Sequence, residues 1–206
     1  MKTVILMCDG LGSRWIDQET KYKHLIEFDG IPLILRTICQ LRKYPCNIIL
    51  IAPDDFKRYF KVPSGVVHTS LGYRENEERT LLNGIVRTQP FWGDDTSILL
   101  GDVVFSSHAI DLLFSDISPF WIMGRSGKNV VTGKFAGELF TLSFPLNLHG
   151  ALLEELKIGG KLWNYYNTYP ISLFSPGDYT DDFDSEQAYE QFYSKMLEAV
   201  RGDVDE

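Results

Sequence analysis

The sequence of 206 residues has few cysteines, and their arrangement predicts neither a disulfide framework nor a zinc site. Cys8, Cys39 and Cys46 form no CxxC pair, and no histidine stands at zinc-ligand spacing from them. An odd, unpatterned set of cysteines is typical of reduced thiols in a reducing compartment. We therefore expect a cytoplasmic protein whose cysteines act as small apolar side chains.

The sequence also lacks long apolar runs. None approaches the roughly 18 residues that predict a membrane-spanning helix. The first run, residues 4–8, is broken by Asp9, whereas a secretory signal needs an apolar region of about 7–15 residues. We expect this run to form a buried strand and the protein to work without a membrane.

An excess of positive charge is absent as well. The chain has 20 lysines and arginines against 28 aspartates and glutamates, a formal net charge of −8 at pH 7. Acidic proteins bind polyanions poorly, so a nucleic acid polymer is not an expected partner. Apolar residues make up 44% and charged residues 23% of the chain, and both values are typical of a globular protein.

Short apolar runs alternate with helical patterns, which predicts an α/β fold with helices on both faces of a mostly parallel sheet. Strands are expected at 3–8, 47–52, 66–69, 97–100, 120–123, 129–132 and 138–144. Helices are expected at 32–44, 54–60, 77–88, 151–156 and 185–200. The length predicts a single domain over 1–206.

A glycine-rich loop follows the first expected strand, where Gly10 and Gly12 precede Arg14. Glycine lets backbone N–H groups approach a phosphate closely, and a guanidinium binds phosphate bidentately at any working pH. The loop lacks the GxxxxGK[ST] pattern of a P-loop, and Trp15 stands at the third glycine position of the dinucleotide fingerprint. On this loop alone, a plain βα turn with a surface arginine is the alternative.

The segment VILMCDGLGSRW, followed by KHLIEFDGIPLILRTI, resembles the opening of the sugar nucleotidyltransferases and their relatives. That family combines a strand, GxG[ST]R, a Pro-Lys-x-Leu step and GxPLI on a GT-A-like, Rossmann-like three-layer αβα fold with a mostly parallel mixed sheet. Its members join a nucleoside triphosphate to a sugar phosphate or another small phosphorylated acceptor and release pyrophosphate. Two positions depart from the pattern: Asp9 replaces a small residue near the expected nucleobase, and Tyr22 replaces the proline.

The resemblance implies roles for particular residues. Arg14 and Lys23 would be the catalytic cations at the reacting phosphates, and Glu138 would contact the acceptor. The nucleotide would be bound by Cys8, Asp9, Gly10, Leu11, Gly12, Ser13 and Thr80. Residues 1–105 would form the nucleotide-binding half and 106–200 the acceptor-binding half, followed by a frayed acidic tail at 201–206. Family frequency favours a pyrimidine triphosphate and a sugar phosphate.

Two carboxylates are candidates for a metal site. Asp102 ends an apolar strand, and in open α/β sheets the carboxyl ends of strands face the ligand crevice. The resemblance matches Asp102 to the first metal aspartate of the family and Asp184, in DDFDSEQAY, to the second. Two carboxylates together with substrate phosphates suit Mg²⁺, which prefers oxygen ligands. The ordinary alternative is that each aspartate only caps the segment after it.

Two other functions stay open. A GT-A glycosyltransferase would use a similar sheet and a nucleotide sugar, although GDV stands at 101–103 where such enzymes usually have DxD. A non-catalytic nucleotide-binding module could keep the same fold. An aromatic cluster, Trp163, Tyr165, Tyr166 and Tyr169, could hold an acceptor or belong to the core.

Overall fold

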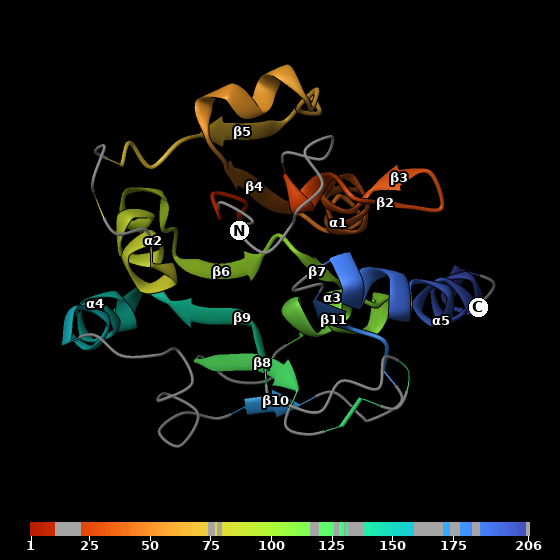
Figure 1. Ribbon diagram of the computed structural model, residues 1–206. Coiled ribbons are helices and arrows are strands. Elements are labelled where there is room, and N and C mark those ends of the chain that lie inside the picture. The colour runs from red at the N-terminus through yellow and green to blue at the C-terminus, as the bar shows by residue number, and fades with distance from the viewer. Residues whose placement is uncertain are drawn as a thin grey trace.

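The computed structural model describes residues 1–10, 22–73, 77, 80–115, 120–125, 128–129, 131, 138–158, 171–173, 178–182 and 186–204. A seven-stranded sheet has the order β10-β8-β9-β6-β1-β4-β5 (Figure 1). Its strands are β1 (Lys2–Met7), β4 (Cys46–Ile51), β5 (Val66–Thr69), β6 (Asp95–Leu100), β8 (Trp121–Arg125), β9 (Glu138–Pro145) and β10 (Ile171–Leu173). Two short pairs join β2 (Glu27–Phe28) to β3 (Ile31–Pro32) and β7 (Val103–Val104) to β11 (Asp181–Asp182). The α-helices are α1 (Leu33–Leu41), α2 (Leu81–Arg87), α3 (Ser107–Leu113), α4 (His149–Ile158) and α5 (Glu186–Val204). The 3₁₀ helices are η1 (Lys23–Leu25), η2 (Asp54–Arg58), η3 (Gln89–Phe91) and η4 (Leu146–Leu148).

Among the strands described in this sheet, β9 alone opposes the common direction. β1 pairs in parallel with β4 and β6, β4 with β5, and β8 with β10, whereas β9 is antiparallel to both β6 and β8. The predicted mixed, mostly parallel sheet is therefore confirmed. Because β9 runs the other way, its first residue, Glu138, lies at the edge where β6 and β8 end.

Helices cover both faces of the sheet because the central strand is apolar on both. Val4, Leu6 and Cys8 belong to one buried cluster, which includes side chains of α1 and α3. Ile5 and Met7 belong to a second cluster, which includes side chains of α2 and α4. Figure 1 shows α2 and α4 on one side of the sheet and α1 and α3 on the other. The predicted three-layer αβα arrangement is confirmed.

A third cluster fastens α5 to the β2–β3 hairpin, through Phe28 on the hairpin and Met196 and Val200 on α5. The hairpin turns at Asp29 and Gly30, whose φ angles of 52° and 74° are both in the left-handed region. Two consecutive positive φ angles define a type I′ turn, for which Asp-Gly is a favoured pair. The hairpin thereby places the amino end of α1 beside α5.

Several predicted boundaries differ from the structure. The helix expected at 77–88 begins only at Leu81, because the Thr80 hydroxyl accepts a hydrogen bond from the Asn83 N–H at 3.2 Å and caps it. The strand expected at 129–132 is wrong for the described residues there, since Asn129 Oδ1 accepts from the Val131 N–H at 2.8 Å in a turn. The last helix continues to Val204, past the residue 200 at which its end is expected.

Within the described part of the chain, no helix is both long enough and apolar enough to cross a membrane. The three cysteines are free thiols, with Cys8 buried and Cys39 exposed.

Candidate active site

The centre of the sheet contains a topological switch point. From β1 the chain first builds β4 and β5 on one side, and it then returns to add β6 on the other side of β1. In open α/β sheets ligands bind in the crevice outside the carboxyl ends of the strands at such a point. Here that crevice is bordered by Cys8 and Asp9, which follow β1, and by Gly101 and Asp102, which follow β6.

Gly101 lets the turn after β6 approach the end of β1 very closely. Its N–H donates to the Met7 carbonyl oxygen at 2.9 Å. A Cβ atom at this position would lie 2.2 Å from Cys8 Sγ and 2.8 Å from the Met7 carbonyl oxygen. Since no side chain fits there, glycine at 101 is what brings Asp102 beside the end of β1.

Lys23 and Asp102 meet in this crevice, 79 residues apart in sequence, where Lys23 Nζ pairs with Asp102 Oδ2. Both side chains are partly buried, with exposed fractions of 19% and 16%. An ion pair that is mostly shielded from water is stronger than a surface pair. The structure thus brings together one expected catalytic cation and the first expected metal ligand.

Tyr22 anchors the short helix that carries Lys23. Its hydroxyl donates to Asp55 Oδ1 at 2.5 Å, and its ring packs edge-on against Phe56 with the ring centroids 5.1 Å apart. The ring is only 6% exposed. At the position where the related family usually has proline, this chain therefore has an aromatic anchor that holds η1 against η2.

His24 and Cys8 are buried beside Gly101, next to the Lys23–Asp102 pair. Burial lowers the pKa of His24 to about 4; the charge of Asp102 opposes this shift and that of Lys23 adds to it. Burial also raises the pKa of the Cys8 thiol well above its usual value, and the negative charges of Asp102 and Asp9 add to the increase. At neutral pH the His24 imidazole and the Cys8 thiol are therefore both uncharged.

The depressed pKa of His24 predicts a loss of stability in mild acid. In the unfolded chain His24 takes up a proton below the ordinary histidine pKa of 6.5, whereas the folded protein resists protonation until about pH 4. The free energy of unfolding should therefore fall as the pH drops from 6.5 to 4, by roughly 3 kcal/mol from this residue. The measurement is the free energy of unfolding in urea for the wild type and for His24→Gln, in EDTA, at pH 7, 6, 5 and 4. The fall toward pH 4 should be smaller in the variant. If the free energy of unfolding fell equally with pH in both proteins, His24 would not be the source of the acid instability.

The second expected metal ligand, Asp184, lies outside the described residues, but the chain just before it is placed. In the β7–β11 pair, Asp182 lies opposite Val103, which directly follows Asp102. The segment that leads to Asp184 therefore runs alongside the segment that leaves Asp102. Arg125, at the end of β8, holds it there through an ion pair of 3.2 Å with Asp181.

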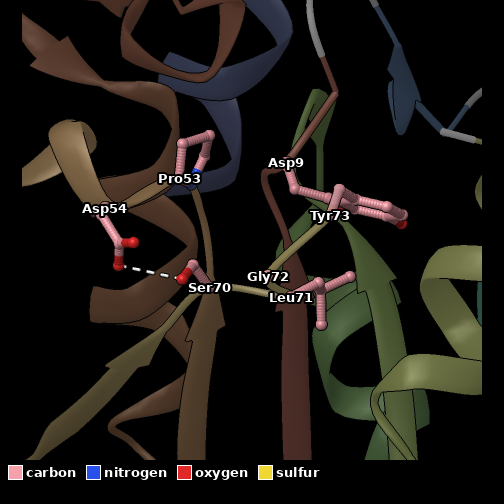
Figure 2. Close-up of a pocket in the computed structure, with 7 residues that line it drawn as sticks. All are labelled: Asp9, Pro53, Asp54, Ser70, Leu71, Gly72 and Tyr73. Atoms are coloured by element: carbon pink, nitrogen blue, oxygen red, sulfur yellow. Dashed lines mark hydrogen bonds between the residues drawn. The ribbon is translucent and has the colours of Figure 1, made fainter. Parts of the chain in front are cut away.

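A pocket of about 140 Å³ opens at the ends of β1, β4 and β5. It is lined by Asp9, Pro53, Asp54, Ser70, Leu71, Gly72 and Tyr73. Figure 2 shows Asp9 and Tyr73 on one side of it and Pro53, Asp54 and Ser70 on the other, where the Ser70 hydroxyl donates to Asp54 Oδ1 at 2.9 Å. Sequence reasoning missed the residues that follow β4 and β5, although the strand-end rule used for Asp102 also applies to them.

Arg87 on α2 supports the pocket wall from outside. Its guanidinium lies over the Tyr73 ring, 4.7 Å from the centroid, and donates to the Leu71 carbonyl oxygen at 3.0 Å. Gly84 allows this approach, because a Cβ there would lie 3.2 Å from the Tyr73 hydroxyl and 3.0 Å from Met7 Cε. The part of the pocket wall formed by Leu71 and Tyr73 is therefore attached to α2.

The remaining expected residues divide into two groups. Glu138 begins β9 opposite Arg125, at the same sheet edge as Asp102. Thr80 caps α2, as described above. Leu11, Gly12, Ser13, Arg14, Asp184 and the aromatic cluster at 163–169 lie outside the described residues.

This architecture is the fold of solved nucleotidyltransferases, and the family resemblance of the opening segment is confirmed at the level of the fold. A Bacillus anthracis protein assigned as a glucose-1-phosphate thymidylyltransferase matches with a TM-score of 0.65 and 14% identity, over 98% of this chain and 96% of that one. The CTP:phosphocholine cytidylyltransferase of Streptococcus pneumoniae gives 0.65 and 15%, over 94% and 97%. The inositol-1-phosphate CTP transferase of T. maritima gives 0.60 and 15%, over 97% of each. No protein-family model and no curated protein sequence matches this chain.

Proposed function

We propose that the protein is a Mg²⁺-dependent nucleotidyltransferase that joins a nucleoside triphosphate to a sugar phosphate or another small phosphorylated acceptor and releases pyrophosphate. The observation that carries the proposal is the Lys23–Asp102 pair at the switch point of the sheet. A cation for phosphate and a carboxylate for a metal are the two charges that this reaction needs side by side. The shared fold of the three nucleotidyltransferases supports the same reaction class.

The chemistry of Asp102 fits a divalent cation. Its Oδ2 pairs with the positive charge of Lys23, and a carboxylate has about four lone-pair positions, so Asp102 could hold Lys23 and still bind a cation. Among the described residues no group of three or more histidine, cysteine or carboxylate side chains is gathered for a metal. Mg²⁺ is commonly held by one or two carboxylates together with substrate phosphates, so Asp102 and Asp184 would suffice as its protein ligands.

In the proposed reaction a phosphate oxygen of the acceptor attacks the α-phosphorus of the triphosphate. The new bond joins that oxygen to the α-phosphorus, and the bond to the bridging oxygen of the β-phosphate breaks, so that pyrophosphate leaves with the electron pair. Lys23 and Arg14 would neutralise the charge that develops on the phosphates. Bound Mg²⁺ would supply charge neutralisation and alignment of the phosphates. The acceptor phosphate is already anionic, so the step needs no general base.

The test is Mg²⁺-dependent pyrophosphate release over a grid of nucleoside triphosphates and acceptors. Glucose 1-phosphate, phosphocholine and inositol 1-phosphate are suitable first acceptors, since the names of proteins with this fold include these groups. We expect release with at least one pair and none in EDTA. Triphosphate binding by folded protein without release from any pair would favour the non-catalytic module. Release of a nucleoside diphosphate from a nucleotide sugar would favour the glycosyltransferase.

A further inference from the structure

The pocket at the ends of β1, β4 and β5 has an acceptor-rich lining. Two of its residues, Asp9 and Asp54, carry carboxylates, and none of the described residues that line it is a lysine or arginine. An ionised carboxylate only accepts hydrogen bonds. The ligand that fits this lining therefore presents N–H or O–H donors to it.

We propose that the Asp9 carboxylate recognises the base of the nucleotide and selects guanine. This inference rests on the proposed function, because it assumes that the triphosphate binds in the crevice beside Lys23 and Asp102. It departs from the pyrimidine that family frequency favours.

The position of Asp9 supports this assignment over Asp54. Asp9 lies at the switch point, two residues after the last residue of β1, Met7, whose carbonyl oxygen accepts from the Gly101 N–H. Asp54 lies across the pocket at the start of η2, where Ser70 donates to its Oδ1 (Figure 2), and it follows β4, which is one strand farther than β1 from β6 and Asp102. A carboxylate has about four lone-pair positions, so Asp9 can hold a protein partner and still accept from a base.

The loop that carries Tyr73, on the same side of the pocket as Asp9 in Figure 2, leaves space for a ligand. Gly72 has a φ of 58°, in the left-handed region, and apart from its two chain neighbours no atom of the described residues lies within 4 Å of the place its Cβ would occupy. The same holds for the Cβ position of Gly10, next to Asp9. Tyr73, held by Arg87, adds an aromatic surface of the kind on which bases stack.

The donor pattern of guanine distinguishes it from the other bases. Guanine carries two adjacent donors, the N1–H and the 2-amino group, which one carboxylate can accept together. Adenine and cytosine present a single amino group beside an acceptor nitrogen. Uracil and thymine present one N–H between two carbonyl oxygens. When one carboxylate oxygen accepts from that N–H, the other oxygen faces a carbonyl oxygen and is repelled by it. A site built to accept a donor discriminates strongly against analogues that lack it.

Inosine triphosphate provides a test that needs no variant, because hypoxanthine is guanine without the 2-amino group. Titration calorimetry of the wild-type protein with Mg²⁺ should give a Kd for GTP about 10–100-fold below that for ITP, the effect of one hydrogen bond to a charged group. UTP should bind at least as weakly as ITP. Equal Kd values for GTP and ITP, or tighter binding of UTP, dTTP, CTP or ATP than of GTP, would overturn the proposal.

Asp9→Asn tests whether Asp9 is the residue that selects guanine. The side-chain amide of asparagine places an NH2 donor beside a carbonyl oxygen acceptor, which matches xanthine, whose C2 carries a carbonyl oxygen beside the N1–H. The variant should lose about 10–100-fold in GTP affinity and gain affinity for XTP. Asp54→Asn changes the other carboxylate of the pocket; a changed GTP-to-ITP ratio there, with Asp9→Asn unaffected, would overturn the assignment to Asp9. Asp95→Asn, at the other end of the sheet, is the matched control and should leave the ratio unchanged.

The two proposals fail in different ways. Pyrophosphate release with UTP or dTTP but not with GTP would overturn guanine selection and leave the transferase intact. Selective GTP binding without release from any acceptor would uphold guanine selection and count against the transferase.

Discussion

Replacing Asp102 with asparagine should lower kcat by about 10³-fold or more while the protein stays folded. The carboxamide has almost the same shape, but it removes the negative charge that would bind Mg²⁺ and that now pairs with Lys23. A metal ion supplies several kcal/mol of transition-state stabilisation, and each 1.36 kcal/mol corresponds to tenfold in rate. The loss should appear mainly in kcat, because the change leaves intact the pocket that we propose for the base.

Asp95→Asn is the matched control for this variant. Asp95 begins β6, the strand that Asp102 follows, and pairs with Lys2 at 3.1 Å at the other end of the sheet. Its side chain is 49% exposed, so the change should leave kcat near that of wild type and stability within about 0.5 kcal/mol. Mg²⁺ titration by calorimetry in the presence of the triphosphate adds a readout independent of turnover. Normal turnover and normal Mg²⁺ affinity in Asp102→Asn would remove Asp102 from the metal site.

The sheet edge at which Asp9 and Asp102 lie could be predicted, because each of the two strands that end there has its own pattern in the sequence. Residues 3–8 and 97–100 are short apolar runs ended by Asp9 and by Gly101-Asp102, and the structure places both ends at the switch point. Buried parallel strands have this continuous apolar pattern because helices cover both their faces. The position of Asp102 thus follows from the pattern of its own strand.

The contacts between segments could not be predicted in the same way. Tyr22 reads as a departure from a family pattern, and only the fold shows that it bonds to Asp55 across 33 residues. The pairing of Asp182 with Val103 joins residues 79 apart through strands of two residues each, which are too short to have a periodicity. The pocket at the ends of β1, β4 and β5 likewise combines three separate strand ends, and its lining depends on which side chains meet there.

The second large effect is expected from Arg125, which lies in a buried cluster of charges. Its side chain is 8% exposed and lies 3.2 Å from Asp181 Oδ1 and 3.9 Å from Asp182 Oδ1; Asp181 is fully buried. Arg125→Met removes the guanidinium and leaves both carboxylates in a low dielectric. Breaking a buried pair in this way typically costs about 3–5 kcal/mol, because the remaining charge is uncompensated. For a chain of this length that lowers the Tm by about 6–20 °C.

The loss of Arg125 should also lower the rate of pyrophosphate release. Residues 178–182 position the chain that leads to Asp184, the second proposed metal ligand, and Arg125 binds this segment. Thr180 Oγ1 accepts from the Ser106 N–H at 2.9 Å, and Asp178 Oδ2 accepts from the Ser106 hydroxyl at 2.8 Å, so this segment is fastened to the start of α3 as well as to β8. Thermal and urea unfolding give the stability of Arg125→Met, and pyrophosphate release below its Tm gives its activity. If the uncompensated charge causes the instability, Arg125→Met/Asp181→Asn should be more stable than Arg125→Met alone, since the second change removes one buried negative charge. A double variant less stable than the single one would show instead that Asp181 stabilises the fold through its other contacts.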